Sequence, residues 1–171
     1  MTHLTIKPLA LVTGIGPGTG TSLVRRFAEG GYRVAMMSRD ADRLATLEAE
    51  IPDTIAVPCD VTDAKALERA INDIGPPKIV VHNAVGGAFG TFHEIEPAVL
   101  QHNFDVNVMA LLRLAQLTTP AMVEAGEGAL IVTGNTSALR GKAKFAGFAP
   151  TKAAQRVLAE SLARSLGPKG I

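Results

Sequence analysis

A glycine-rich turn near the N-terminus is the feature that most narrows the folds open to this chain. It reads Thr13-Gly14-Ile15-Gly16-Pro17-Gly18-Thr19-Gly20 and joins an apolar segment, Leu9–Thr13, to a segment of helical periodicity, Gly18–Glu29. Glycine lets the backbone adopt positive φ and approach a ligand closely, and a helix N-terminus offers free N–H groups to an anion. The order strand, turn, helix therefore predicts a phosphate-binding turn formed by Gly14, Gly18, Thr19 and Gly20.

Apolar runs and helical segments alternate along the rest of the chain, which is typical of β-α units on a parallel sheet buried on both faces. We expect further strands at Arg33–Met37, Ile55–Val57, Ile79–His82 and Ala129–Thr133. We expect helices after Asp40, at Thr62–Ile74, at Pro97–Met122 with a break or bend near Asn103, and at Thr151–Leu166. The sequence thus predicts an α/β fold class, a Rossmann-type doubly wound parallel sheet in three α/β/α layers, as a single domain spanning residues 1–171.

Composition restricts the class of partner. The 171 residues are 47% hydrophobic, which suits one domain with a sizeable core, and the formal charge of +1 comes without any basic run. Nucleic acid and anionic membranes are therefore not expected as partners, and a small-molecule ligand is. Met1–Lys7 lacks the pattern of a targeting signal and no apolar run approaches the ~18 residues of a membrane span, so we expect a cytoplasmic protein. Cys59 is the single cysteine and is expected to be a buried thiol at a strand end.

Two more motifs follow the glycine-rich turn, each directly after an expected strand. Asp60 and Val61 stand in Cys59-Asp60-Val61-Thr62 after the third expected strand, and Asn83 stands in His82-Asn83-Ala84, followed by Gly86-Gly87, after the fourth. Together with the turn, these motifs make the chain resemble the short-chain dehydrogenase/reductase family. The resemblance implies that Asp60 contacts the adenine of a bound dinucleotide, with Val61 beside it, and that Asn83 lines the cofactor. His82 departs from the family's first asparagine, and we expect it to have a structural role.

The end of the second strand indicates which dinucleotide is bound. An acidic side chain at this place hydrogen-bonds the ribose of NAD, whereas a nearby arginine accommodates the 2′-phosphate of NADP. The sequence reads Met37-Ser38-Arg39-Asp40, with Ser38 in place of the acid and Arg39 offering a guanidinium suited to phosphate. We therefore predict NADP(H) over NAD(H). The alternative is that Arg39 is a solvated loop residue, and Asp40 is a helix cap in either case.

The catalytic pattern of the family is only half retained. The resemblance implies a proton-donating tyrosine, a lysine four residues later that holds the nicotinamide ribose, a serine thirteen residues before the tyrosine, and an asparagine that supports a water relay. Lys152 and Asn107 occupy the lysine and asparagine positions. The tyrosine position holds Phe148, and the serine position holds Asn135. Two of the four chemical roles are therefore altered.

Asn135 can still donate an amide N–H to a substrate carbonyl, but Phe148 cannot supply a proton. Losing a general acid costs about 10² to 10⁴ in rate. A two-residue slip of the loop could bring Ser137 to the serine position, whereas Tyr32, the only tyrosine, lies on the far side of the sheet. No role is assigned to the remaining polar side chains of these regions, which are expected to be surface residues: His93, His102, Lys142 and Lys144.

The chain stops at Gly167–Ile171, where relatives continue into further strands, so we expect a truncated form or a fragment with one uncovered sheet edge. Relatives associate through the helices that correspond here to Asp105–Met122 and Thr151–Leu166, which implies a homodimer or homotetramer. The leading hypothesis is an NADP-dependent oxidoreductase acting on an alcohol or carbonyl compound. The alternative is a catalytically silent NADP(H)-binding protein, favoured by Phe148. A third, an interaction module without cofactor, is disfavoured by the intact binding motifs.

Overall fold

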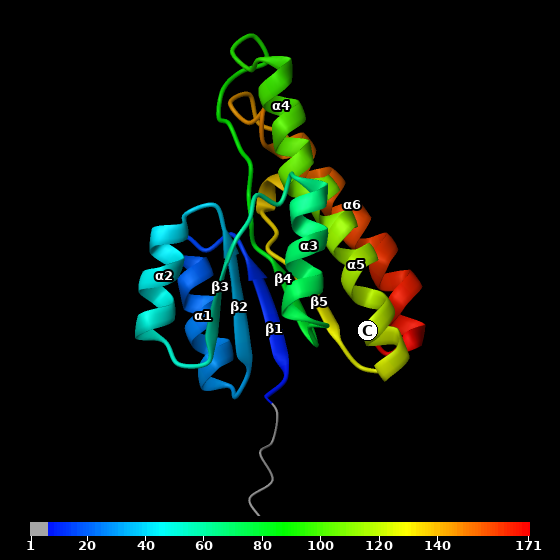
Figure 1. Cartoon of the computed structure of the whole chain (residues 1–171). Helices are drawn as coiled ribbons and strands as arrows, with labels where there is room; N and C mark the ends of the chain where they lie inside the picture. Colours follow the sequence, from blue (N-terminus) through cyan, green and yellow to red (C-terminus); the bar gives the residue numbers. More distant parts are fainter. Residues whose placement is uncertain (1–6) are drawn as a thin grey trace, which may run out of the picture.

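Five parallel strands form the centre of the molecule. The structure, a computed structural model, describes residues 7–171. Of the segment Met1–Lys7, for which no targeting signal is expected, only Lys7 lies within the described residues. The sheet order is β3-β2-β1-β4-β5, as expected for a doubly wound sheet (Figure 1). The strands are β1 (Leu9–Thr13), β2 (Arg33–Ser38), β3 (Thr54–Pro58), β4 (Ile79–His82) and β5 (Ala129–Val132).

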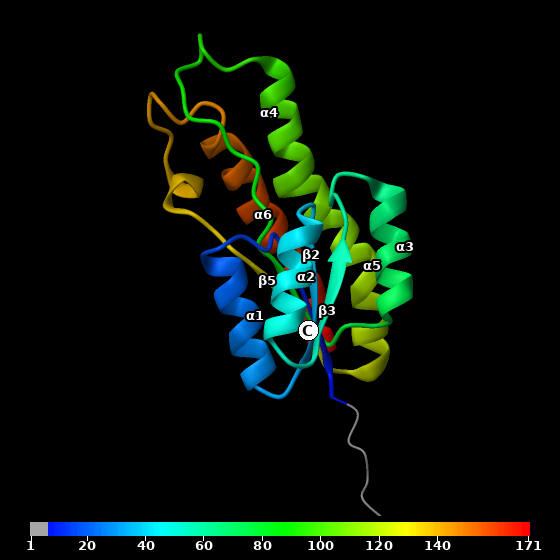
Figure 2. The same ribbon diagram turned by 60° about the vertical axis from the view of Figure 1, so that its left-hand side comes forward.

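Helices cover both faces of the sheet and give the three layers that the sequence predicts. On one face, α1 (Thr19–Glu29) and α2 (Ala41–Glu50) pack against strand side chains such as Val12 and Met36. On the other, α3 (Ala64–Ile74) and α5 (Ala110–Ala125) pack against side chains such as Leu11 and Met37, which alternate with the first set. Figures 1 and 2 show α6 (Ala149–Leu166) lying beside α5 on this second face.

Helix boundaries follow the capping residues. Asp40 caps α2 by accepting a hydrogen bond from the backbone N–H of Arg43, as expected from the sequence. Asp63 caps α3, so this helix begins at Ala64 and not at the expected Thr62. The last helix begins at Ala149, two residues before the expected start, because Pro150 fits in the first turn, where no N–H partner is needed.

The long helix predicted at Pro97–Met122 is one continuous run with a change of helical type. It consists of α4 (Pro97–Phe104), a π-helical turn η1 (Asp105–Met109) and α5. The break expected near Asn103 is therefore this π turn, which begins two residues later. By length and composition the run Pro97–Ala125 could cross a membrane, which corrects the expectation that no such segment exists. Half of its most apolar window is buried inside the protein, as in a core helix.

The order in which strands are added to the sheet reverses between β1 and β4, because β2 and β3 extend to one side of β1 while β4 and β5 extend to the other. Thr13 at the end of β1 pairs with His82 at the end of β4. In sheets of this kind ligands bind in the crevice outside the carboxyl ends of the strands at such a switch point. The turns after β1 and β4 are therefore the place to look for a site.

Candidate cofactor and reaction site

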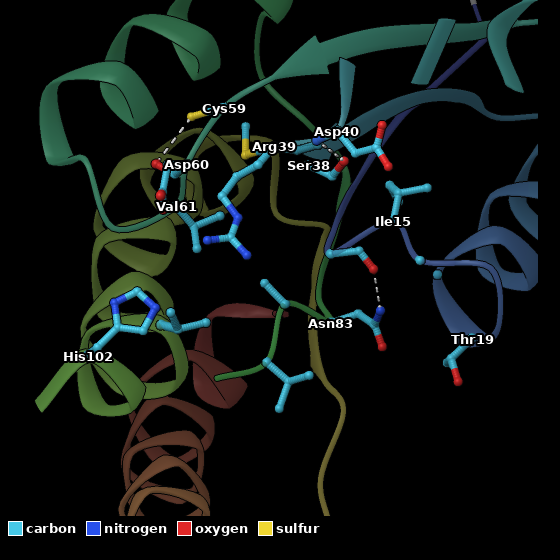
Figure 3. A pocket seen from close by; sticks show the side chains of 17 residues that line it. Ile15, Thr19, Ser38, Arg39, Asp40, Cys59, Asp60, Val61, Asn83 and His102 are labelled. Atoms are coloured by element: carbon cyan, nitrogen blue, oxygen red, sulfur yellow. Dashed lines mark hydrogen bonds between the residues drawn. The ribbon is translucent and has the colours of Figure 1, made fainter. Parts of the chain in front are cut away.

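A cavity of about 500 Å³ lies at the switch point. It collects side chains and backbone from the turns that follow β1, β2, β3 and β4, together with two residues of the long helix (Figure 3). Of the sequence-predicted cofactor residues, those that line it are Gly14, Thr19, Gly20, Ser38, Arg39, Asp60, Val61 and Asn83. Gly18 and Lys152 do not line it, and Gly18 instead occupies the position that caps α1.

The glycine turn has the geometry that an anion-binding site needs. Gly14 has φ of +75°, and a Cβ at this position would lie 2.4 Å from the backbone nitrogen of Ala84. A Cβ on Gly20 would lie 2.4 Å from the Gly14 oxygen, so helix and turn are in close contact. Within the described chain, no side chain caps α1 and no acidic residue stands in its first turn. The N–H of Thr21 donates to the Gly16 carbonyl at 3.1 Å, so the N–H groups of Thr19 and Gly20 are the ones that stay free for a phosphate, and the turn fits a dinucleotide.

A buried hydrogen-bond network ties this turn to β4. The side chain of Asn83 donates to the Gly14 carbonyl at 2.8 Å. Thr13 Oγ1 accepts from the backbone N–H groups of Asn83 and Ala84, both at 3.2 Å, and lies 3.0 Å from His82 Nδ1. His82 Nε2 lies 3.0 Å from the Val106 carbonyl. Because a carbonyl only accepts, Nε2 carries the proton and Nδ1 accepts from Thr13, so His82 is neutral and structural, as the sequence predicts.

His82 should make the folded protein sensitive to acid. Burial lowers the pKa of His82 from 6.5 to about 4, with Lys152 nearby adding to the effect. In the unfolded chain the His82 side chain therefore becomes protonated below pH ~6.5, whereas in the folded chain it becomes protonated only near pH 4. The stabilisation is complete above pH ~6.5 and is lost as the pH falls toward 4, by about 3 kcal/mol at 1.4 kcal/mol per pKa unit. Urea unfolding at pH 7.5 and pH 4.5 measures it, and a His82→Asn variant with the same pH dependence as the wild type would contradict it.

The end of β2 points Ser38 and Arg39 into the cavity. Ser38 Oγ accepts a hydrogen bond from the backbone N–H of Asp40 at 3.2 Å, which leaves its hydroxyl proton for a ligand. Figure 3 shows the Arg39 guanidinium reaching into the cavity on the side of Asp60 and Val61. Asp40 also lines the cavity, but its carboxylate is engaged by the backbone N–H and the guanidinium of Arg43. The Ser38 hydroxyl and the Arg39 guanidinium are therefore the groups here that suit a phosphate.

Asp60 and Val61 form the wall of the cavity next to Arg39, across from Ile15 and Thr19 (Figure 3). Burial raises the pKa of the Asp60 carboxyl, but hydrogen bonds from Thr62 and the charges of Arg39 and His102 outweigh this and hold the pKa below its usual value. Cys59 is buried beside it, as expected, and burial together with the Asp60 charge raises the pKa of its thiol. An ionised Asp60 held by Thr62 is a fixed hydrogen-bond acceptor at the edge of the cavity.

A second polar cluster lies next to the cavity and centres on Lys152. The side chain is only 3% exposed, and its Nζ donates to the Thr133 carbonyl at 3.1 Å and to Gln155 Oε1 at 2.8 Å. Among residues 7–171 no carboxylate forms a salt bridge with it. Burial lowers its pKa accordingly. An ammonium group has three protons, so one remains for a ligand.

Asn107 connects this cluster to the cavity. Its side chain donates to the Gly86 carbonyl at 2.7 Å and to Thr151 Oγ1 at 2.8 Å, and accepts from the Gly86 N–H at 3.0 Å. The neighbours Val85 and Val106 line the cavity. The asparagine side chain is thus fully used in holding the loop after β4 against η1 and α6.

Phe148 stands beside Lys152 in an aromatic group. The Lys152 nitrogen lies 5.9 Å from the centre of the Phe148 ring, within the range of a cation–π contact. Phe89 packs on Phe148 at 5.4 Å and on Phe145 at 5.2 Å between ring centres. A Cβ on Gly87 would lie 2.8 Å from the Phe148 ring, so this glycine makes room for it. The residue at the tyrosine position is therefore beside the lysine, without an acidic proton.

Asn135 caps the short helix η2 (Thr136–Leu139). Its Oδ1 accepts from the backbone N–H of Ser137 at 2.8 Å and from Ser137 Oγ at 2.7 Å. Asn135 is exposed, with its amide N–H₂ left to donate, whereas Ser137 is buried and turned toward Asn135. Asn135 is thus the better placed of the two to meet a substrate oxygen from solvent.

Two contributors were not assigned from the sequence. His102 on α4 lines the cavity and faces Asp60, although a surface position was expected for it. Its side chain is exposed as expected, but at the rim of the site (Figure 3). Gln155 holds Lys152, and its position three residues later on the same helix face was the signal that could have revealed it. Lys142 and Lys144 are exposed, as expected.

Comparisons with known proteins agree with this geometry. A family profile described as short chain dehydrogenase matches residues 8–171. Carbonyl reductase [NADPH] 2 from Sus scrofa is 33% identical over 165 residues, which are 95% of this chain and 67% of that protein. L-xylulose reductase from Mesocricetus auratus is 31% identical over 163 residues, with the same coverage of both chains.

The fold is also shared with a metagenomic short-chain oxidoreductase whose crystal structure contains NADP. The TM-score is 0.90 at 26% sequence identity, and the match covers 96% of this chain and 79% of that one. The chain spans about two thirds of the length of the curated relatives that it matches.

Proposed function

Because the chain belongs to the short-chain dehydrogenase family, we propose that it is an NADP(H)-dependent oxidoreductase acting on an alcohol or carbonyl compound. The observation that carries this proposal is one cavity at the switch point, which joins the phosphate-binding turn to Ser38 and Arg39 and adjoins the buried Lys152. The relatives named as an NADPH carbonyl reductase and an L-xylulose reductase support the cofactor and the substrate class.

Each residue has a role that its surroundings favour. The turn from Gly14 to Gly20 and the first N–H groups of α1 bind the pyrophosphate, and Ser38 with Arg39 binds the 2′-phosphate. Asp60, Val61 and Asn83 line the adenosine side of the cavity. Lys152 uses its remaining proton to hold the nicotinamide ribose. When bound, NADP(H) would supply or accept the hydride, while Asn135 would donate its amide N–H to the substrate oxygen. Because Phe148 has no proton to give, the proton that completes the alcohol would come from water.

In this proposal residues 1–171 are a single NADP(H)-binding domain, cytoplasmic and assembled as a homodimer or homotetramer, as the family resemblance implies. Phe148 favours the alternative of a catalytically silent NADP(H)-binding protein, because it removes the proton donor. The relatives that match are named as reductases and dehydrogenases, which gives that alternative no support.

The proposal is tested by titrating the protein with NADPH and NADH while following nicotinamide fluorescence, and then by measuring NADPH consumption with a panel of ketones, aldehydes and ketoses. Selective NADPH binding with turnover is the expected result. Selective binding without turnover on any substrate would favour the silent protein, and no binding of either cofactor would contradict both.

Arg39→Ala should change cofactor selectivity. A hydrogen bond to a charged group contributes about 1.5–3 kcal/mol, and 1.4 kcal/mol corresponds to a tenfold change in Kd. We expect the Kd for NADPH to rise about tenfold or more, while the Kd for NADH stays within about twofold. Arg43→Ala is the matched control, because Arg43 pairs with Asp40 and does not line the cavity. Equal losses for both cofactors in Arg39→Ala would contradict a 2′-phosphate contact.

A further inference from the structure

Gln155 is a buried polar side chain that the proposed function leaves without a role. It lies on α6, three residues after Lys152, and is 2% exposed. Its Oε1 accepts a hydrogen bond from Lys152 Nζ, and its Nε2 donates to the backbone carbonyl of Asn107, each at 2.8 Å. An amide buried without partners costs about 1–3 kcal/mol, but here both ends are satisfied. Gln155 is therefore a direct bridge between the lysine and the long helix.

The carbonyl at the far end of this bridge is available because of the π-helical turn. In η1 the backbone N–H of Ala110 bonds to the Asp105 carbonyl, five residues back, so the usual hydrogen-bond register is shifted. Two successive carbonyls of this turn accept bonds from side chains outside the helix. That of Val106 accepts from His82, and that of Asn107 accepts from Gln155.

Lys152 depends on this bridge to remain charged. In the described part of the chain its ammonium group is hydrogen-bonded by two neutral oxygens, those of Thr133 and Gln155, and faces the Phe148 ring. A buried charge is costly unless it is hydrogen-bonded. Without the Gln155 oxygen, only one of the three ammonium protons would have a protein acceptor, and the flexible side chain would be free to turn away from the site.

The bridge also differs chemically from water. The family resemblance predicts a water relay supported by Asn107, and a water molecule can take up one proton while releasing another. The Gln155 amide accepts only at Oε1 and donates only at Nε2. In its ordinary form neither atom does both, so a proton cannot pass along this link from the Asn107 side to Lys152.

We propose that Gln155 is a positioning residue that clamps Lys152 to the Asn107 carbonyl in place of a relay water, fixing the lysine as a cofactor-binding cation and closing the proton route behind it. The effect on cofactor binding rests on the proposed function. The effect on Lys152 itself does not, because it is present in the protein without cofactor.

The clamp is tested with Gln155→Met, which keeps the length of the side chain without its hydrogen bonds, and with Gln116→Leu on the exposed side of α5 as control. Lys152 is titrated in the cofactor-free protein by NMR of ¹³C-labelled lysine. Neutral His82, whose pKa is about 4, does not titrate in the alkaline range used. We expect Q155M to lower the pKa of Lys152 further and to raise the Kd for NADPH about tenfold, whereas Q116L changes neither.

An unchanged pKa of Lys152 in Q155M would overturn the clamp. A lowered pKa in a protein that binds no NADPH, even as wild type, would keep the clamp and remove the proposed function. If Q155M fails to fold, Q155L gives the same test, because leucine also removes the Gln155 oxygen and fills most of the space that a replacing water would need.

The closed proton route is tested in a Phe148→Tyr background. Q155A leaves space for a water that can bond both Lys152 and the Asn107 carbonyl, whereas Q155M fills that space. Adding Q155A should therefore raise the reductase rate about tenfold, and adding Q155M should not. Equal rates for the two double variants would overturn this part of the proposal.

Discussion

Phe148→Tyr is expected to raise the rate of NADPH-dependent carbonyl reduction by about 10² or more, because general acids contribute about 10² to 10⁴ to such reactions. The ring already lies beside Lys152, with 5.9 Å between the ring centre and the ammonium nitrogen. A cation at this distance favours the ionised form of a phenol and so lowers its pKa from about 10 toward the working pH. The variant would therefore regain a tuned acid at the position where the family carries one.

The measurement is steady-state NADPH consumption with the best substrate of the panel, at several pH values. Phe145→Tyr is the matched control, since it adds the same hydroxyl to a ring of the same aromatic group that lies beside the exposed Lys142, at 5.6 Å, and not beside Lys152. A gain in Phe148→Tyr alone, with a pH profile that shows a new ionisation, is the expected outcome. No gain, with unchanged NADPH affinity, would mean that the substrate side of the site cannot use an acid here.

The fold could be predicted closely because its signals are local. Asp40 caps the start of α2 and Gly75 caps the end of α3, each through contacts with its own neighbours in sequence. The glycine turn is recognised by the same logic, since Gly14 adopts a backbone conformation that other residues disfavour. Boundaries shifted by one or two residues where two caps competed, as at Thr62, which bonds back to Asp60 while Asp63 caps the helix.

The candidate site was predicted less completely because several of its contacts join distant segments. His102 reaches the cavity only because α4 continues the long helix past the sheet, which no local pattern around it reveals. Gln155 pairs with a carbonyl 48 residues away, and that carbonyl is turned outward by a π turn whose sequence looks like ordinary helix. Asp60 and Asn83 were predicted without knowing which distant segments they contact, since the family motif that contains each residue already implies its place in the site.

Gly14→Ala is expected to destabilise the fold by about 3 kcal/mol or more, a large part of the 5–15 kcal/mol that holds a typical domain together. The φ of +75° costs an alanine about 1–2 kcal/mol by itself. The new Cβ would also lie 2.4 Å and 2.5 Å from the backbone N and Cα of Ala84, which cannot turn aside as a side chain could. Moving Ala84 away would break the bond from Asn83 to the Gly14 carbonyl.

Two properties should therefore fall together in Gly14→Ala, the free energy of unfolding in urea and the affinity for NADPH, because one contact between turns supports both. Gly16→Ala is the matched control within the same turn, since nothing lies within 4 Å of a Cβ placed there. We expect its unfolding free energy to stay within about 1 kcal/mol of the wild type, the usual cost of an unobstructed substitution. Equal stability of the two variants would show that the loop after β4 yields to the extra methyl group. The tight contact between the turns would then not be what shapes the phosphate site.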